Sequence, residues 1–272
     1  MPESPTLELR DITKSFGSVQ ALSDVDFEVR SGEVMALVGD NGAGKSTLIK
    51  TVAGIHAADH GEILFDGQPV HISSPKDAAK LGIEVVYQDL ALCDNLDVVQ
   101  NMYLGREAHD ALQRLQEAVM EQKTSETLRS LRVTTIRSIR QSVATLSGGQ
   151  RQSVAGLSGG QRQAVAVAKS VMWNSKVVIL DEPTAALGVA QTRQVLDLVK
   201  RLGEQGLGVV LISHNLHDIF EVADRITVLR LGRNAGLYER EKTNQQEVVH
   251  AITAGAPTKV AGITTAETGA PA

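Results

Sequence analysis

The stretch Gly39-Asp40-Asn41-Gly42-Ala43-Gly44-Lys45-Ser46 follows a mostly apolar run, Glu33–Val38, and precedes Leu48-Ile49. This order predicts a buried strand, a glycine-rich loop and then a helix. The eight residues fit the pattern G-x-x-x-x-G-K-[ST], in which glycines let backbone N–H groups wrap phosphates and the helix N-terminus adds its dipole. Lys45 is placed to neutralise β- and γ-phosphates, and Ser46 to ligate Mg²⁺. The sequence therefore predicts a site for ATP or GTP.

Two carboxylates follow a second apolar run. Lys176–Leu180 leads directly into Asp181 and Glu182, and a helically patterned segment separates it from a third run, Gly208–Ile212. This alternation predicts a parallel sheet flanked by helices, which binds its ligands at the carboxyl ends of the strands. We expect Asp181 to hold the metal ion through water. We expect Glu182 to orient the water that attacks the γ-phosphate or to accept its proton.

The rest of the chain divides into three patterns. Leu7–Ile12 and Val25–Val29 alternate apolar and polar residues, which predicts half-buried strands in an antiparallel sheet near the N-terminus. Arg106–Arg132 is polar and lacks strand patterning, and we interpret it as a helical insert. Its apolar residues that could share one helical face are Leu112, Leu115, Val119, Leu128 and Leu131. From Ala254 on, the small polar residues predict a disordered tail.

The composition excludes several classes of protein. The 272 residues are 42% hydrophobic and 22% charged, as in ordinary globular chains. No apolar run approaches the roughly 20 residues that span a bilayer, and Met1–Pro5 lacks the pattern of a secretory signal. The single cysteine, Cys93, excludes an internal disulfide and fits a reducing compartment. A net charge of −5 and 3% aromatic residues argue against nucleic acid as a partner.

A second glycine-rich loop identifies the family. Leu157-Ser158-Gly159-Gly160-Gln161 opens a patterned helix, which is again an anion-binding arrangement. With the two earlier motifs in this order, the chain resembles the ATP-binding subunit of ABC transporters from about Leu7 to Ala251. The resemblance implies an α/β fold with a P-loop NTPase core, a parallel sheet, an N-terminal antiparallel β subdomain and an inserted α-helical subdomain. It places the core at about 1–90 and 164–253, the helical subdomain at about 91–163, and the tail at 254–272.

The resemblance also implies roles for individual residues. Phe16 matches the aromatic residue that stacks on adenine. Gln88 matches the glutamine that senses the γ-phosphate and Mg²⁺ and begins the loop coupled to the membrane subunit. His214 matches the switch histidine that contacts the γ-phosphate. The catalytic set is then Glu182, His214 and Gln88, and the metal set is Ser46, Gln88 and Asp181. The remaining residues expected to bind ATP are Gly39, Asn41, Gly42, Ala43, Gly44, Lys45, Thr47, Ser158, Gly159, Gly160 and Gln161.

Partners follow from the same resemblance. Two copies, or this chain and a paired ATPase subunit, would sandwich two ATP molecules. Each ATP would lie between the phosphate loop of one subunit and the Ser-Gly-Gly segment of the other. Closure would drive a polytopic membrane permease, with a periplasmic or extracytoplasmic solute-binding protein as an indirect partner. This places the chain peripherally at the cytoplasmic face of the cell (inner) membrane. The amino-acid sequence of residues 86–107 is similar to that of bacterial monosaccharide importers.

The segment Leu146–Gln152 recurs letter for letter as Leu157–Gln163, eleven residues later. The family has one copy here, so the chain carries a tandem duplication. Gln161 precedes Asp181 by twenty residues, which is the family's spacing, whereas Gln150 precedes it by thirty-one. Extra residues upstream of Ser158 lengthen a connection at a cost of about 1 kcal/mol or less. We therefore expect the second copy to be used, although the residues upstream of the first copy normally lead straight into the motif.

Gly188 is a second departure, because the family usually has aspartate there and uses it in communication between the two nucleotide sites. Two alternative functions remain open on the sequence. One is an ATP-binding subunit with a regulatory or assembly role, whose hydrolysis is impaired by the duplicated motif. The other is a soluble ABC ATPase that acts on ribosomes or DNA. The acidic isoelectric point of about 5.8 argues against the latter.

Overall fold

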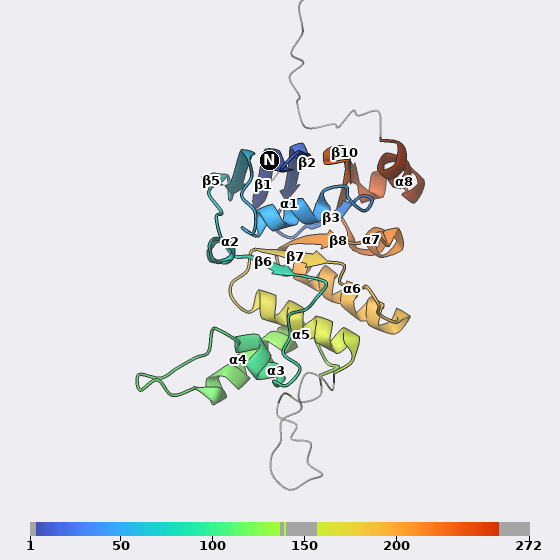
Figure 1. Cartoon of the computed structure of the whole chain (residues 1–272). Coiled ribbons are helices and arrows are strands. Elements are labelled where there is room, and N and C mark those ends of the chain that lie inside the picture. Colours follow the sequence, from blue (N-terminus) through green and yellow to red (C-terminus); the bar gives the residue numbers. More distant parts are fainter. Residues whose placement is uncertain (1–3, 137–138, 140–156, 256–272) are drawn as a thin grey trace, which may run out of the picture.

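The computed structural model describes residues 4–136, 139 and 157–255 (Figure 1). The first motif copy, Leu146–Gln152, and residues 256–272 of the expected tail lie outside this part of the chain. The strands are β1 (Leu7–Phe16), β2 (Val19–Val29), β3 (Val34–Val38), β4 (His60–Phe65), β5 (Gln68–Val70), β6 (Ile83–Val86), β7 (Val177–Asp181), β8 (Gly208–Ile212), β9 (Arg225–Arg230) and β10 (Arg233–Glu239). The helices are α1 (Lys45–Val52), α2 (Pro75–Leu81), α3 (Val98–Tyr103), α4 (Glu117–Ser130), α5 (Gly159–Val171), α6 (Val189–Glu204), α7 (Leu216–Val222), the 3-10 turn η2 (Arg240–Lys242) and α8 (Gln245–Ala254).

A six-stranded sheet forms the centre of the molecule, in the order β10-β9-β3-β8-β7-β6. The pairs from β9 through β6 are parallel, and β10 joins β9 as an antiparallel edge strand. A second sheet, β2-β1-β4-β5, is antiparallel throughout. The predicted α/β fold with a parallel sheet and an N-terminal antiparallel sheet is confirmed.

The side chains of β3 alternate between two hydrophobic cores, one on each face of the central sheet. Val34, Ala36 and Val38 pack with residues of α5 and α6, whereas Met35 and Leu37 pack with the antiparallel sheet and α1. All five side chains are buried, as expected for a strand whose sheet is covered on both faces. This double burial fixes where β3 ends and the phosphate loop begins.

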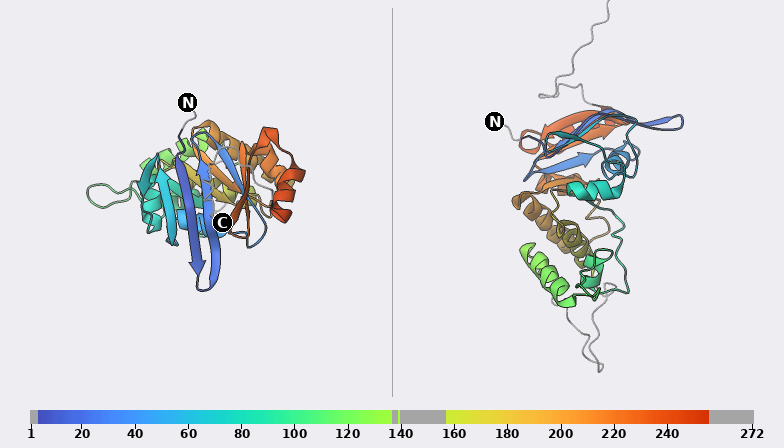
Figure 2. Two further views of the ribbon diagram at one scale, coloured as in Figure 1. Left: turned by 90° about the horizontal axis from the view of Figure 1, so that it is seen from above. Right: turned by 90° about the vertical axis from the view of Figure 1, so that its left-hand side faces the viewer.

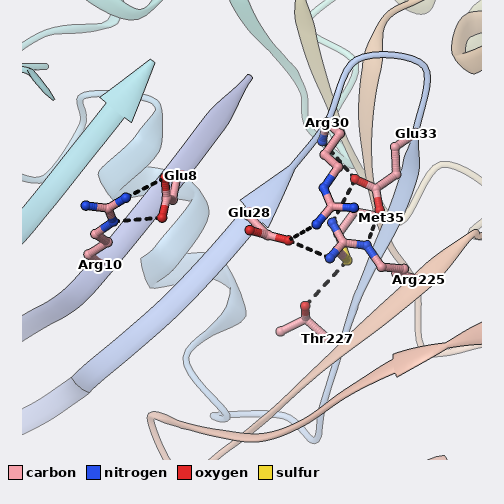
Figure 3. Close-up of polar contacts among 8 residues, drawn as sticks. All are labelled: Glu8, Arg10, Glu28, Arg30, Glu33, Met35, Arg225 and Thr227. Atoms are coloured by element: carbon pink, nitrogen blue, oxygen red, sulfur yellow. Dashed lines mark hydrogen bonds and ion pairs between the residues drawn. The ribbon is translucent and has the colours of Figure 1, made fainter. Parts of the chain in front are cut away.

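Arg225, at the start of β9, links the two sheets (Figure 3). Its guanidinium bonds to both carboxylate oxygens of Glu33 and donates to Glu28 of β2 at 2.5 Å. Burial alone lowers the pKa of Arg225, but the bonds to these two carboxylates raise it above its ordinary value overall. Because Glu33 directly precedes β3, the network anchors the antiparallel sheet over the strand that leads into the phosphate loop.

The helices α3 and α4 lie at the end of the molecule away from the antiparallel sheet (Figures 1 and 2). The expected helical insert over 106–132 is helical only from Glu117 to Ser130. Before it, the carboxylate of Asp110 accepts hydrogen bonds from the backbone N–H groups of Leu112 and Arg114, which forms a local turn instead of a helix. Leu112 is accordingly 71% exposed and shares no buried helical face with Leu128.

In the described ranges, no helix combines the length and the apolar character needed to cross a membrane.

Candidate functional site

A cavity of about 710 Å³ opens at the carboxyl ends of four strands of the central sheet. Its walls come from the loop between β3 and α1 and from the residues after β6, β7 and β8, which include Gln88, Asp181, Glu182 and His214. These four strands are neighbours in the order β3-β8-β7-β6. Segments far apart in sequence therefore meet because parallel strands end at one edge of the sheet.

The phosphate loop needs glycine at two points for lack of space. A Cβ atom at Gly39 would lie 2.2 Å from the carbonyl oxygen of Leu229, and one at Gly44 would lie 2.8 Å from a methyl group of Leu22. Both residues also adopt positive φ values, 152° and 102°. No side chain in the described part of the chain caps α1, and Lys45, Ser46 and Thr47 of its first turn line the cavity.

Lys45 begins α1 and is half-buried in the loop. Its Nζ donates to the carbonyl oxygens of Gly39 and Asp40, at 2.6 and 3.0 Å. Burial lowers the pKa of Lys45, while the nearby carboxylates of Glu182 and Asp181 oppose that shift. The ammonium group is thus held over the loop and is available for an anion of higher charge.

Asp181 ends β7, and Glu182 directly follows it. Burial raises the pKa of Asp181, the adjacent Glu182 carboxylate raises it further, and Lys45 opposes both effects. Glu182 has φ 51°, a left-handed conformation that is costly for a residue with a side chain. Its Oε2 lies 2.8 Å from Nδ1 of His214. The structure therefore pairs two of the sequence-predicted catalytic side chains directly.

The residues expected to hold Mg²⁺ also reach this cavity. Ser46, Gln88 and Asp181 all line it, and they offer a hydroxyl, an amide oxygen and a carboxylate. These are hard oxygen donors of the kind that Mg²⁺ takes, usually with few protein ligands and several from water and phosphate. The described residues contain no cluster of three or more acidic, histidine or cysteine side chains that could hold a metal ion. The donor set fits Mg²⁺ bound together with a nucleotide.

Phe16 is not among the residues that line the cavity. Its ring is 44% exposed, meets the His56 ring edge-on at 5.1 Å and has Nζ of Lys14 5.5 Å from its centre. Its cross-strand partner Val19 does line the cavity, together with Gln20. Adenine stacking by Phe16 therefore stays a prediction, with the ring beside the cavity rather than in its wall.

The second Ser-Gly-Gly segment forms the start of α5, away from this cavity. The Ser158 hydroxyl accepts from the Gln161 N–H at 3.3 Å, and Gln161 Oε1 accepts from the Ser158 N–H at 2.8 Å, which is a capping box. Gln161 also donates to the carbonyl oxygen of Thr135 at 2.6 Å. Ser158 and Gly159 are exposed, and Ser158, Gly159, Gly160 and Gln161 do not line the cavity of their own chain.

Several lining residues escaped the sequence analysis. They are Val19, Gln20, Ala21, Ala185, Ile212, Leu231 and Gly232. Leu231 and Gly232 come from the turn between β9 and β10, and Gly232 N–H donates to the carbonyl oxygen of Ala43 in the phosphate loop. No local sequence signal marks this contact, because it depends on long-range strand pairing.

Comparison with known proteins agrees with this geometry. The ABC transporter family profile matches residues 22–185. The xylose/arabinose import ATP-binding protein XylG of Sulfolobus acidocaldarius is 45% identical, over 94% of this chain and 97% of the relative. The fructose import ATP-binding protein FrcA of Rhizobium meliloti is 46% identical, over 86% of this chain and 88% of the relative. A crystal structure of a nucleotide-free ATP-binding cassette from an ABC transporter has the same fold, with TM-score 0.74 and 23% identity over 92% of this chain and 96% of that one.

Proposed function

The chain belongs to the ABC transporter family, and from that premise we propose that it hydrolyses ATP to drive the import of a monosaccharide. The observation that carries the proposal is the cavity in which Lys45, Asp181, Glu182 and His214 meet at one edge of the parallel sheet. The import of a sugar is supported by the relatives, which are named as sugar import ATP-binding proteins. The motif evidence argues for ATPase activity, and the relatives argue for the substrate class.

The side chains divide the chemistry of ATP hydrolysis among them. The α1 N–H groups and Lys45 bind the β- and γ-phosphates and stabilise charge as the bond between the γ-phosphorus and the bridging oxygen breaks. The Glu182 carboxylate orients the water that forms the new P–O bond and accepts its proton, while His214 holds that carboxylate. Ser46, Gln88 and, through water, Asp181 would hold Mg²⁺, which would supply further charge neutralisation. ADP and phosphate are the products.

We place the second motif copy in a dimer. Ser158 caps α5 on an exposed surface, and its segment lies outside the cavity of its own chain. An exposed anion-binding helix start of this kind suits the nucleotide of a second subunit. The spacing argument and the observed start of α5 both support Ser158 to Gln161 as the copy in use.

A groove beside Gln88 suits the contact with a permease. It has a volume of about 650 Å³ and lies between α2, β6 and Arg106, with Tyr87, the residue before Gln88, in its wall. Its lining is mostly apolar, with Lys76 and Lys80 at its edge. A permease loop seated there would reach the cavity through Gln88. The assembly would place this chain at the cytoplasmic face of the membrane, with a solute-binding protein delivering the sugar from outside.

The test is Mg²⁺-dependent ATP hydrolysis by the full chain assembled with its permease. We expect turnover in the unaltered chain and a loss of at least about 100-fold in Glu182→Gln, because a general base contributes on this scale. Deletion of 146–156, which removes one copy of the repeat, should change turnover by less than about twofold if the second copy is used. An inert chain that the deletion activates would instead support the hydrolysis-impaired alternative.

A further inference from the structure

Asp218 in α7 is a buried carboxylate that the proposed chemistry does not use. Asp218 is only 3% exposed. Aspartate is rarely buried to this degree unless its oxygens are well satisfied, since desolvation of a carboxylate is costly. The question is therefore which groups satisfy it and what these groups have in common.

The two oxygens of Asp218 serve two different loops. Oδ2 accepts a hydrogen bond from the Thr184 hydroxyl at 2.7 Å, and Oδ1 accepts one from the Asn215 side-chain amide at 2.9 Å. Thr184 stands two residues after Glu182, and Asn215 directly follows His214. A single buried carboxylate thus joins the loop that carries Glu182 to the loop that carries His214.

Both loops make other hydrogen bonds, some local and one between the ends of β7 and β8. Asn215 caps α7 by accepting from the His217 N–H at 3.0 Å, and its own N–H donates to the Ser213 hydroxyl at 3.0 Å. Glu182 adopts the costly left-handed conformation described above, and its N–H donates to the carbonyl oxygen of Ile212. Strained backbone persists only where surrounding contacts hold it. The bond from Thr184 to Asp218 is such a contact, close behind the strained residue.

We propose that Asp218 is a positioning residue that holds the Glu182 loop and the His214 loop in register, through Thr184 and Asn215. The proposal rests on the proposed function, because it assigns Glu182 and His214 to hydrolysis. Asp218 itself does not line the cavity. Its effect is geometric: it fixes the separation between the carboxylate that accepts the proton and the imidazole that holds this carboxylate.

The decisive variants change only the hydroxyl of Thr184. Thr184→Val keeps the shape of the side chain but removes the donor, whereas Thr184→Ser keeps the donor. We expect Thr184→Val to lower kcat for ATP hydrolysis about tenfold with KM for ATP changed less than about twofold, because a small misplacement of a catalytic group acts on the chemical step. Thr184→Ser should restore most of kcat. Thr124→Val is the matched control, since Thr124 is a fully buried threonine whose hydroxyl has no partner among the described residues.

The positioning role also predicts non-additivity. In the Glu182→Gln background, Thr184→Val should change the residual turnover by less than about twofold, because the base on which it acts is already absent. A full tenfold loss in that background, or equal kcat in Thr184→Val and unaltered protein, overturns the proposal. A loss shared equally by Thr184→Ser also overturns it.

A second measurement does not depend on activity. Amide hydrogen exchange in Thr184→Val should accelerate both at 183–187 and at 214–217, although the substituted side chain lies in the first segment alone. Acceleration confined to 183–187 would show that Asp218 does not couple the loops. If the unaltered chain fails to hydrolyse ATP, the proposed function fails, while this exchange experiment still decides whether Asp218 is a bridge.

Discussion

Two helices of this chain begin at glycine-rich loops, and their first turns are built differently. The first turn of α1 follows Gly44, carries no side-chain cap in the described structure and opens into the cavity with Lys45. The first turn of α5 is closed by the capping box of Ser158 and Gln161 and faces outward. Sequence reasoning predicted an anion site at both. The structure surrounds the first with acidic and basic side chains and leaves the second on the surface.

This difference fits the proposed dimer, in which α1 supplies most of one nucleotide site and the start of α5 completes the site of the second subunit. The α1 site lies at the carboxyl ends of four strands, whereas Ser158 and Gly159 at the start of α5 are exposed. Gly159 and Gly160 pack closely against residues 187–191. A Cβ atom at Gly159 would lie 2.8 Å from a methyl group of Leu187, and one at Gly160 would lie 3.2 Å from Cβ of Gln191. The glycines therefore bring the start of α5 close to the loop after Glu182.

The largest expected effect is on ATP binding, which should depend on the start of α1 and not on the start of α5. Lys45→Ala should weaken ATP binding to the isolated chain by about 100-fold or more, because the loop loses its charged partner for the phosphates. Ser158→Asp should leave that affinity within about twofold, since α5 does not line the cavity. Isothermal titration with ATP measures both. Equal losses in the two variants would contradict the distinction between the two regions.

A smaller effect separates the capping role of Ser158 from its proposed role in the dimer. Ser158→Ala should lower the free energy of unfolding by about 1 kcal/mol through loss of the cap, whereas Ser158→Asp keeps a capping oxygen. Both should lower turnover about tenfold, the aspartate by repelling the γ-phosphate of the second subunit. Urea unfolding and steady-state turnover together test this. Full turnover in Ser158→Asp would exclude a phosphate at this helix start.

The smallest expected effect concerns stability and the charge of Asp181 at the α1 site. It is measured without nucleotide or Mg²⁺. Burial and Glu182 raise the pKa of Asp181, so the folded chain holds that proton more tightly than the unfolded chain does. The stabilisation that comes from protonated Asp181 is present at low pH and is lost as the pH rises through the pKa of Asp181 in the folded state. Asp181→Asn should therefore stabilise the chain at pH 7, by about 0.5 kcal/mol or more. The gain should shrink as the pH falls toward about 4. An equal melting temperature at pH 7 would contradict it.

The sequence was sufficient for the elements whose signals are local. The apolar runs at β3, β7 and β8 and the glycine pattern after β3 define the central sheet and one edge of it. Gln88 and His214, which the resemblance singled out, also line the cavity at this edge, and their roles stay predictions. Both residues follow strands of the parallel sheet, and parallel strands end at the same edge. Their side chains therefore come together without any further contact having to be predicted.

Features that depend on strand register or on particular side-chain hydrogen bonds were not predictable. Phe16 lies beside the cavity wall because the register of the β1–β2 hairpin places Val19 there instead. Asp110 stops the expected helix through a turn that outweighs the apolar spacing of Leu112 and Leu115. Asp218 accepts a hydrogen bond from Thr184, thirty-four residues before it, which no periodicity signals.

The central claim, that one subunit's phosphate loop works with the α5 start of another, is tested most directly by mixing two defective chains. Both carry Glu182→Gln to block hydrolysis; one also carries Lys45→Ala and the other Ser158→Asp. Sedimentation with Mg²⁺-ATP should show dimers for Glu182→Gln alone, monomers for each doubly substituted chain, and dimers when the two are mixed, because one composite site is then intact. Monomers in the mixture, with dimers in the Glu182→Gln control, would contradict the claim.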